Sequence, residues 1–135
     1  MGNKIITDRG KTELLRLGFV DGSEGAFNYI ALGDGDSKAA QGGVFSEVNG
    51  NGYERVETTL ETDIVGDEKQ IEISGVFNEA NYAVNGDGGL ITEIGLCNSS
   101  ISGSNDEVFF LYSEVPQIYK TDNISLKYTI IISID

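Results

Sequence analysis

Residues 123–135, NISLKYTIIISID, decide the fold class because two kinds of side chain alternate along them without interruption. A period of two places the two sets on opposite faces of a β-strand. One set is Ile124, Leu126, Tyr128, Ile130, Ile132 and Ile134, and the set between them is Ser125, Lys127, Thr129, Ile131 and Ser133. The sequence therefore predicts a strand over about residues 124–134, roughly twice the typical strand length.

Five further segments are typical of strands in composition and in the turn residues around them. They are residues 27–32 (FNYIAL), 53–64, 70–77, 90–97 (LITEIGLC) and 108–115. The first ends at a GDG turn, and the second and third flank GDEK, which favours a tight hairpin. Six strands with glycine-rich connections and no βαβ rhythm predict an antiparallel arrangement.

Individual residues refine these expectations. Ile73 and Phe77 lie on one face of the 70–77 strand, and residues 90–97 are apolar on both faces, as in a central strand. Cys97 is expected to be a small buried side chain, and Pro116 is expected to end the fifth segment because proline donates no hydrogen bond to a sheet.

One helix is expected, over about residues 8–17. Thr7 or Asp8 would cap it, its leucines would face one side, and Gly18 would end it. Residues 37–52 have no clear period and are expected to form a loop with at most one helical turn. The sequence thus predicts a mainly β protein: one domain over 1–135, an antiparallel β-sandwich or partly closed barrel with a short N-terminal helix.

The charge and composition exclude several classes of function. The chain has 22 acidic and 9 basic residues and a formal net charge of −13, which opposes binding to nucleic acid or to anionic membranes. Neither a signal peptide nor an apolar run of transmembrane length is recognisable, so a soluble product of the cytoplasm is expected.

Catalytic and metal-binding patterns are incomplete. The chain has no histidine, which excludes the common histidine-based triads. A carboxylate-dependent hydrolase is the lowest-ranked hypothesis, because nothing in the sequence pairs two of its many glutamates. Those considered are Glu47, Glu54, Glu57, Glu61, Glu72 and Glu93. The GDGDS at 33–37 and NGDGG at 85–89 lack the remaining ligands of a calcium loop. We expect no catalytic residue, no metal and no cofactor.

Four segments carry a family resemblance: TDRGKTELLRLGFVDG, FNYIALGDGD, YERVETT and LITEIGLCNS. In order and spacing they resemble the N-terminal domain of phage tail-collar and tail-fibre proteins. The corresponding positions are Gly10-Lys11, Gly33-Asp34-Gly35, Glu54-Arg55 and Glu93-Ile94-Gly95-Leu96. From these we select candidate structural residues, namely Gly33, Asp34, Gly35, Arg55, Glu93 and Gly95.

The resemblance implies a virion structural protein, a non-catalytic module that joins a fibre to the tail or baseplate as part of a trimer or ring. Family proteins commonly continue into a shaft and a receptor-binding tip, whereas this sequence ends at Asp135 inside its last strand, which favours an adaptor, baseplate or tail-completion subunit. Other tail proteins are the expected partners. Tyr119, Ile131 and Ile134 are the candidate interface residues, because exposed strand edges can pair between subunits.

Two alternatives remain open from the residues themselves. A carbohydrate- or receptor-binding β-sandwich would use loop residues such as Tyr82, Asp87 and Tyr119. Glu93, within an apolar strand, needs a partner, for which Arg55 or Lys127 is the expected salt bridge.

Overall fold

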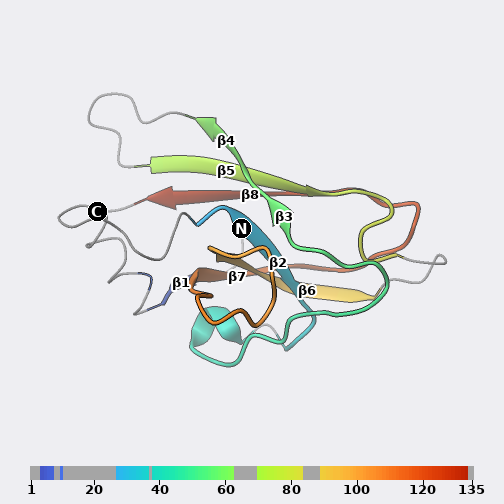
Figure 1. Cartoon of the computed structure of the whole chain (residues 1–135), viewed down its shortest axis with the longest axis horizontal. Coiled ribbons are helices and arrows are strands. Elements are labelled where there is room, and N and C mark those ends of the chain that lie inside the picture. Colours follow the sequence, from blue (N-terminus) through green and yellow to red (C-terminus); the bar gives the residue numbers. More distant parts are fainter. Residues whose placement is uncertain are drawn as a thin grey trace.

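The computed structural model describes residues 4–7, 10, 27–36, 38–62, 70–83 and 89–133. In this part of the chain the structure is mainly β, with short connections and one 3-10 turn, as expected (Figure 1). The elements are β1 (Lys4–Ile6), β2 (Tyr29–Gly33), η1 (Ala39–Gln41), β3 (Val56–Glu57), β4 (Thr59–Thr62), β5 (Gln70–Phe77), β6 (Leu90–Cys97), β7 (Phe109–Tyr119) and β8 (Leu126–Ser133).

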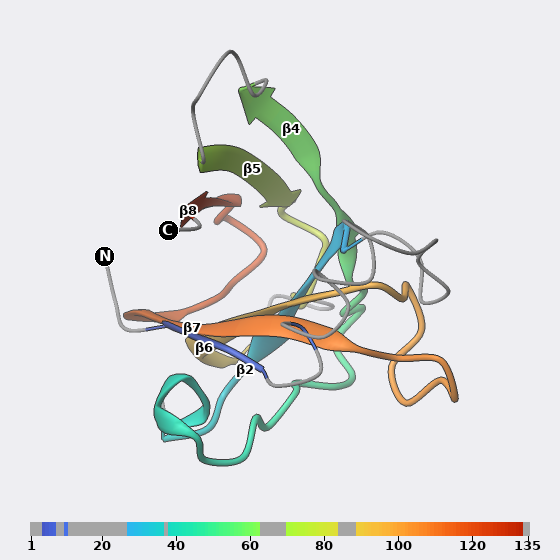
Figure 2. The same ribbon diagram turned by 90° about the vertical axis from the view of Figure 1, so that its left-hand side faces the viewer.

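The strands form two antiparallel sheets. The larger has the order β1-β7-β6-β2-β3 and the smaller β4-β5-β8. Figure 2 shows them as two layers, with η1 on the far side of the larger sheet. The sheets do not close into a barrel, so the sandwich is the correct one of the two expected architectures.

The chain passes directly from one sheet to the other at Thr58. β3 pairs with β2 in the larger sheet, and β4 pairs with β5 in the smaller. Between them, the Thr58 amide donates to the Asn28 carbonyl at 2.8 Å. The single strand expected over 53–64 was therefore wrong: residues 53–55 precede β3 as irregular chain, and the extended segment is divided between two sheets. Period-two patterning does not reveal such a corner, because both halves are extended.

The core lies between the two sheets. It is formed by apolar side chains of both inner faces, including Ile30 and Leu32 of β2, Phe77 of β5 and Ile130 of β8. All residues of β6 from Ile91 to Cys97 are buried, because β2 and β7 flank this strand and both of its faces are covered. The expectation that residues 90–97 form a central strand is confirmed, as is the burial of Cys97.

β7 continues through Pro116, so the expected strand end at this residue was wrong. Within the described residues, β1 pairs with Leu111–Ser113 on one side of β7, and β6 is the neighbour on the other side. The β6–β7 register also shifts between Ile91 and Glu93, near the proline. A proline is tolerated where one edge of a strand is unpaired or the ladder is irregular.

The other elements expected from the sequence agree with the structure in some cases and differ in others. The bounds of 70–77 and 90–97 are confirmed, whereas β1 was not expected from the sequence. The helix over 8–17 lies outside the described residues except at Gly10, whose amide donates to Thr7 Oγ1 at 2.8 Å. That hydrogen bond is the one an N-cap threonine makes to the third helical residue.

A second, smaller layer covers the face of the larger sheet that points away from the sandwich core. η1 packs on β1 and β7. The Phe45 ring stacks on that of Tyr112 with centroids 5.1 Å apart, and it is tilted against the Phe109 ring at 5.3 Å. Gly95 of β6 lies directly beneath these rings, and a Cβ at this position would be 2.6 Å from the Phe109 ring. The glycine is therefore required by the close approach of the aromatic cluster.

We expect Gly95→Ala to lower the free energy of unfolding by about 1–3 kcal/mol, the usual cost of overpacking a close-packed interior. The Phe109 ring cannot yield easily because Phe45 and Tyr112 pack against it. Urea unfolding would measure the change. The same substitution in a Phe109→Leu background is the matched control, because the smaller side chain removes the ring atoms that the new Cβ would meet. Equal losses in the two backgrounds would contradict this account.

Candidate functional site

Polar and glycine residues of three of the four family-like motifs gather in two polar centres on the covered outer face of the larger sheet, and the first motif lies outside the described residues except at Thr7 and Gly10. One centre is built around Glu93 of β6, and the other around Arg55, which directly precedes β3. Both side chains are among the buried polar residues of the described chain. The motifs therefore occupy interior positions beneath the loops of the second layer.

Glu93 is enclosed by the turn that follows β2. Its residue is only 1% exposed, and its carboxylate accepts the Ala39 amide at 3.4 Å and the Ser46 amide at 3.3 Å. Gly33 and Gly35 lie against it: a Cβ on Gly33 would be 2.8 Å from Glu93 Cγ, and one on Gly35 would be 3.0 Å from Oε2. The GDG sequence thus provides room for a buried carboxylate.

The turn itself is held by hydrogen bonds to both neighbouring segments. The Asp34 amide donates to the Ser46 carbonyl at 3.0 Å, and Ser46 Oγ donates to Asp34 Oδ1 at 3.1 Å. On the other side, Thr92 Oγ1 donates to the Gly35 carbonyl at 2.7 Å. Asp34 therefore fixes the loop over Glu93.

The predicted partners of Glu93 were wrong. Arg55 pairs with Glu47 and Glu107, and Lys127 pairs with Glu61. Burial raises the pKa of Glu93, the two backbone amides oppose this rise, and nearby Asp36 and Asp34 add to it. The Glu93 carboxylate is therefore hydrogen-bonded by loop amides in place of the expected salt bridge. A pattern of side chains in the sequence does not reveal such backbone donors.

Arg55 is the most highly connected side chain of the second centre. Its Nε and Nη2 donate to the two oxygens of Glu47 at 2.8 and 2.7 Å, and Nη2 also pairs with Glu107 at 2.6 Å. Nη1 donates to the carbonyls of Ser99 at 2.9 Å and Ile101 at 3.4 Å. These contacts engage all three nitrogens of the guanidinium, whose side chain is 1% exposed.

Two further contacts place Arg55 against the sheet. Its Cζ lies 5.3 Å from the centre of the Phe109 ring, and Nη1 is 3.4 Å from Cys97 Sγ. Burial raises the pKa of the Cys97 thiol, although Arg55 opposes the rise. The thiol is therefore held protonated in a closed environment, which agrees with a structural role for Cys97.

Glu47 is the shared acceptor of this centre. Tyr53 Oη donates to Glu47 Oε2, Ser102 Oγ donates to Oε1 at 2.7 Å, and Tyr53 Oη accepts the Leu32 amide at 3.1 Å. Burial alone would raise the pKa of Glu47, but the hydrogen bonds from Arg55, Tyr53 and Ser102 outweigh burial and lower it. The carboxylate is thus held in its charged form, as Arg55 requires.

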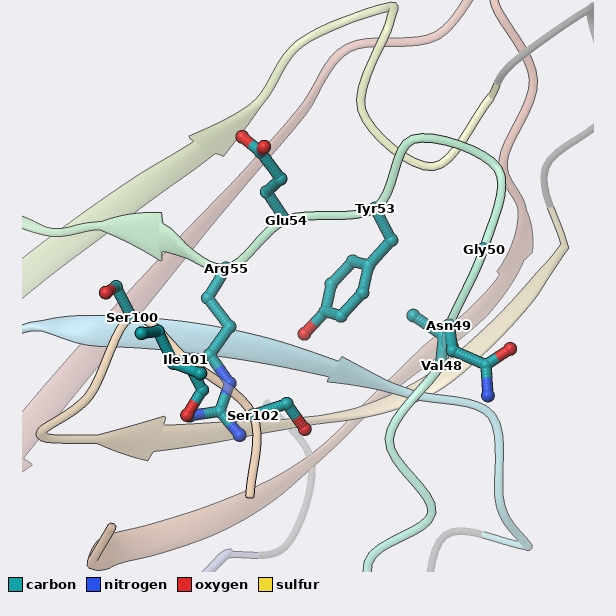
Figure 3. A pocket seen from close by; sticks show the side chains of 9 residues that line it. All are labelled: Val48, Asn49, Gly50, Tyr53, Glu54, Arg55, Ser100, Ile101 and Ser102. Atoms are coloured by element: carbon teal, nitrogen blue, oxygen red, sulfur yellow. The ribbon is translucent and has the colours of Figure 1, made fainter. Parts of the chain in front are cut away.

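An open pocket of about 520 Å³ lies beside the Arg55 centre (Figure 3). It is lined by Val48, Asn49, Gly50, Tyr53, Glu54, Arg55, Ser100, Ile101 and Ser102. The Tyr53 and Arg55 side chains point in the same general direction, whereas the Glu54 side chain points away from them. The two walls are the NGNG loop, with positive φ at Gly50, Asn51 and Gly52, and the loop after β6.

Lys120 is a buried charge that the sequence analysis missed. It is 0% exposed, and its Nζ donates to the carbonyls of Asn78, Glu79 and Thr121 at 3.0, 3.2 and 3.1 Å. Burial lowers the pKa of Lys120, while Glu79 and Asp122 oppose that change. Nothing local distinguishes this lysine from the solvent-exposed ones, because all its acceptors are backbone atoms.

The expected binding residues that the structure describes lie on different elements. Of the candidate interface residues, Tyr119 is 58% exposed, Ile131 is partly buried on β8, and Ile134 lies outside the described residues. Tyr82, expected to contact a glycan, is buried with its ring 6.1 Å from that of Tyr53, and Asp87 lies outside the described residues.

The described residues contain neither a metal-binding group of side chains nor a membrane-spanning helix. In this part of the chain, no three histidine, cysteine or acidic side chains are grouped so as to hold a metal ion. Within the same ranges, no helix is long and apolar enough to cross a membrane. The pocket contains one carboxylate, Glu54, among its lining residues.

No family model, curated protein or solved structure matches this chain. The resemblance to phage tail-collar and tail-fibre proteins therefore depends on the short motifs alone.

Removal of the Arg55 guanidinium should strongly lower the free energy of unfolding. We expect Arg55→Met to lower the free energy of unfolding by about 3–5 kcal/mol, because it leaves Glu47 and Glu107 partly buried without their cation. The matched control is Lys127→Met, which removes an exposed pair with Glu61 and should cost at most about 1 kcal/mol. Urea titrations of both variants measure the difference, and similar losses would show that Arg55 is no more important than a surface lysine.

The buried carboxyl of Glu93 should give an inverted pH dependence. Its folded pKa lies above the ordinary value of 4.5, so the folded state holds the proton more tightly than the unfolded state. As the pH rises from 4.5 through the folded pKa, wild type should therefore lose stability relative to Glu93→Gln. Unfolding free energies of both proteins across this range measure the slope, which is independent of any constant packing cost of the amide.

Glu47→Gln provides the opposite control. The folded pKa of Glu47 is lowered, so its contribution to stability is fully present above pH 4.5 and is lost as the pH falls through the folded pKa. The advantage of wild type over Glu47→Gln should shrink toward acid pH. If both variants gave slopes of the same sign, the assignment of the two carboxyls would be incorrect.

Proposed function

We propose that this chain is a structural subunit of a bacteriophage tail, collar or baseplate, which acts through protein–protein contacts and is not an enzyme. Its place is in the virion, and its partners are other tail proteins and further copies of itself in a trimer or ring. Neither nucleic acid nor a membrane is a partner in this proposal, in keeping with the net charge of −13.

The observation that carries the proposal is the position of the motif residues. Gly33, Gly35 and Glu93 form one packed unit, and Gly95 lies beneath the Phe109 ring near Arg55. Short motifs far apart in the sequence thus meet on one face of one sheet, which a chance similarity of glycine-rich segments does not require. What they build is a set of fixed loops, and fixed loops suit an assembly module.

The polar chemistry of this face also favours a structural role. The carboxylates of Glu47 and Glu107 are paired with Arg55, and Glu93 is closed off beneath a turn. A general acid or base must reach the proton that it transfers. The buried and half-buried carboxyls of this face are instead used in internal packing, which supports a non-catalytic proposal.

The alternative, a carbohydrate- or receptor-binding module, has less support. Tyr82 is buried, so it presents no ring face to a sugar. Tyr119 is accessible, but a single exposed tyrosine is ordinary on a protein surface.

The proposal predicts that the purified chain self-associates and that it is a component of phage particles. Size-exclusion chromatography with light scattering measures its mass in solution, and mass spectrometry of purified virions tests for its presence. A host protein of similar abundance that is not part of the particle is the control for carry-over. A monomeric protein that is absent from the particles would refute the proposal.

A further inference from the structure

The pocket beside Arg55 has rigid walls. On one side, the Tyr53 amide donates to the Gly50 carbonyl at 2.9 Å. The backbone of Glu54 is held by Asn81, whose Oδ1 accepts its amide at 3.1 Å and whose Nδ2 donates to its carbonyl at 3.0 Å. On the other side, Ser99 Oγ contacts both the amide and the carbonyl of Ile101 at 3.1 Å. A preorganised cavity loses little conformational entropy when it is filled.

Part of the lining is apolar and accessible. Ile101 is held by its backbone, yet its side chain is 67% exposed at the edge of the pocket. Val48 lies in the wall, and Tyr53 contributes its ring (Figure 3). Such a surface fits an aliphatic chain or stem.

The charges around the pocket are unbalanced. Arg55 is the basic residue of the lining, and it already pairs with both Glu47 and Glu107. Glu54, an exposed residue of the lining, adds a third carboxylate. The region therefore has an excess of negative charge, and a cation is the complementary ligand.

An anion is disfavoured for the same reason. The guanidinium of Arg55 is 1% exposed and directs its nitrogens at carboxylates, carbonyls and a sulfur. A phosphate or sulfate would have to displace these partners while lying beside three glutamates. The pocket therefore has no free cation to offer such a ligand.

We propose that this pocket receives a basic side chain of a partner protein, whose aliphatic stem packs on Ile101, Val48 and Tyr53 and whose charged head lies toward Glu54. Ser100 and Ser102 are in the same wall and present hydroxyl oxygens that can accept hydrogen bonds from an ammonium or guanidinium group. The inference deepens the proposed function, since it identifies the chemistry of one of the contacts through which the subunit would assemble.

The partner is a different protein and not a second copy of the chain. Two copies would each bring a net charge of −13 to the contact, with 9 basic residues against 22 acidic ones. Of the basic residues whose side chains the structure describes, Arg55 and Lys120 are buried, while Lys38 and Lys127 pair with Asp36 and Glu61. A basic segment of another subunit meets the pocket without this repulsion.

The test uses isotope-labelled protein and short peptides. Amide chemical shifts are followed by NMR during titration with the heptapeptides Gly-Ser-Leu-Lys-Leu-Ser-Gly and its arginine counterpart, with glutamate and glutamine versions as controls. We expect shifts confined to residues 48–55 and 98–107 for the two basic peptides only, and weaker binding as salt is raised.

Matched variants separate the two parts of the pocket. Glu54→Gln should weaken binding of the basic peptides by about tenfold, because a hydrogen-bonded charge contact is lost. Glu57→Gln removes an exposed carboxylate from the same segment outside the pocket and should leave binding unchanged. Ile101→Ser should also weaken binding, whereas Val44→Ser, at a more exposed apolar position outside the lining, should not.

Several outcomes would overturn the inference. They are no shifts with either basic peptide, equal shifts with the glutamate peptide, equal effects of Glu54→Gln and Glu57→Gln, or shifts in the pocket with the neutral disaccharide maltose and none with the peptides. The proposed function is judged separately: presence in virions without peptide binding removes only this inference, and peptide binding by a protein absent from virions removes only the proposed function.

Discussion

One buried guanidinium determines how the loops of this protein are arranged. Arg55 joins the segment before β3 to Glu47 of the second layer, to Glu107 and two carbonyls of the loop after β6, and to the ring of Phe109. A lysine could not replace it, because only the planar fork of arginine reaches a bidentate carboxylate and further acceptors at once. Arg55 belongs to one wall of the pocket and hydrogen-bonds to the loop that forms the other, so this side chain sets the position of the two walls relative to each other.

The Glu93 centre lies on the same face of the sheet and buries an acidic side chain where the Arg55 centre buries a basic one. Here the buried charge is negative, and the groups that satisfy it are two loop amides. Because Gly33, Gly35 and Gly95 have no Cβ, the Glu93 carboxylate and the aromatic cluster have room between the sheet and the loops. Burying charges contributes little net stability, but it strongly disfavours alternative loop arrangements in which those charges would lose their partners.

The sequence allowed the prediction of whatever depends on period or turn chemistry. The bounds of β5 and β6 follow from alternation and from continuous apolarity, and the burial of Glu93 and Cys97 follows from their place in β6. The sheet switch at Thr58 and the continuation of β7 through Pro116 depend on which neighbour each strand has, and that is tertiary information. For the same reason, Arg55 and Glu93 were identifiable as unusual residues, but their partners were not.

Lys120 extends this principle to the segment between β5 and β6. Its ammonium group binds carbonyls on both sides of the contact between the segment after β5 and the end of β7, so the connections there are also tied by a buried charge. Three buried charges thus fix loops in different parts of the sandwich. A surface whose loops are already ordered loses less conformational entropy when a partner binds, so modest contacts suffice for a specific interaction. In a strongly acidic chain, such fixed loops also hold surface carboxylates at defined positions. A basic partner is then selected by the spacing of its charges as well as by their sign.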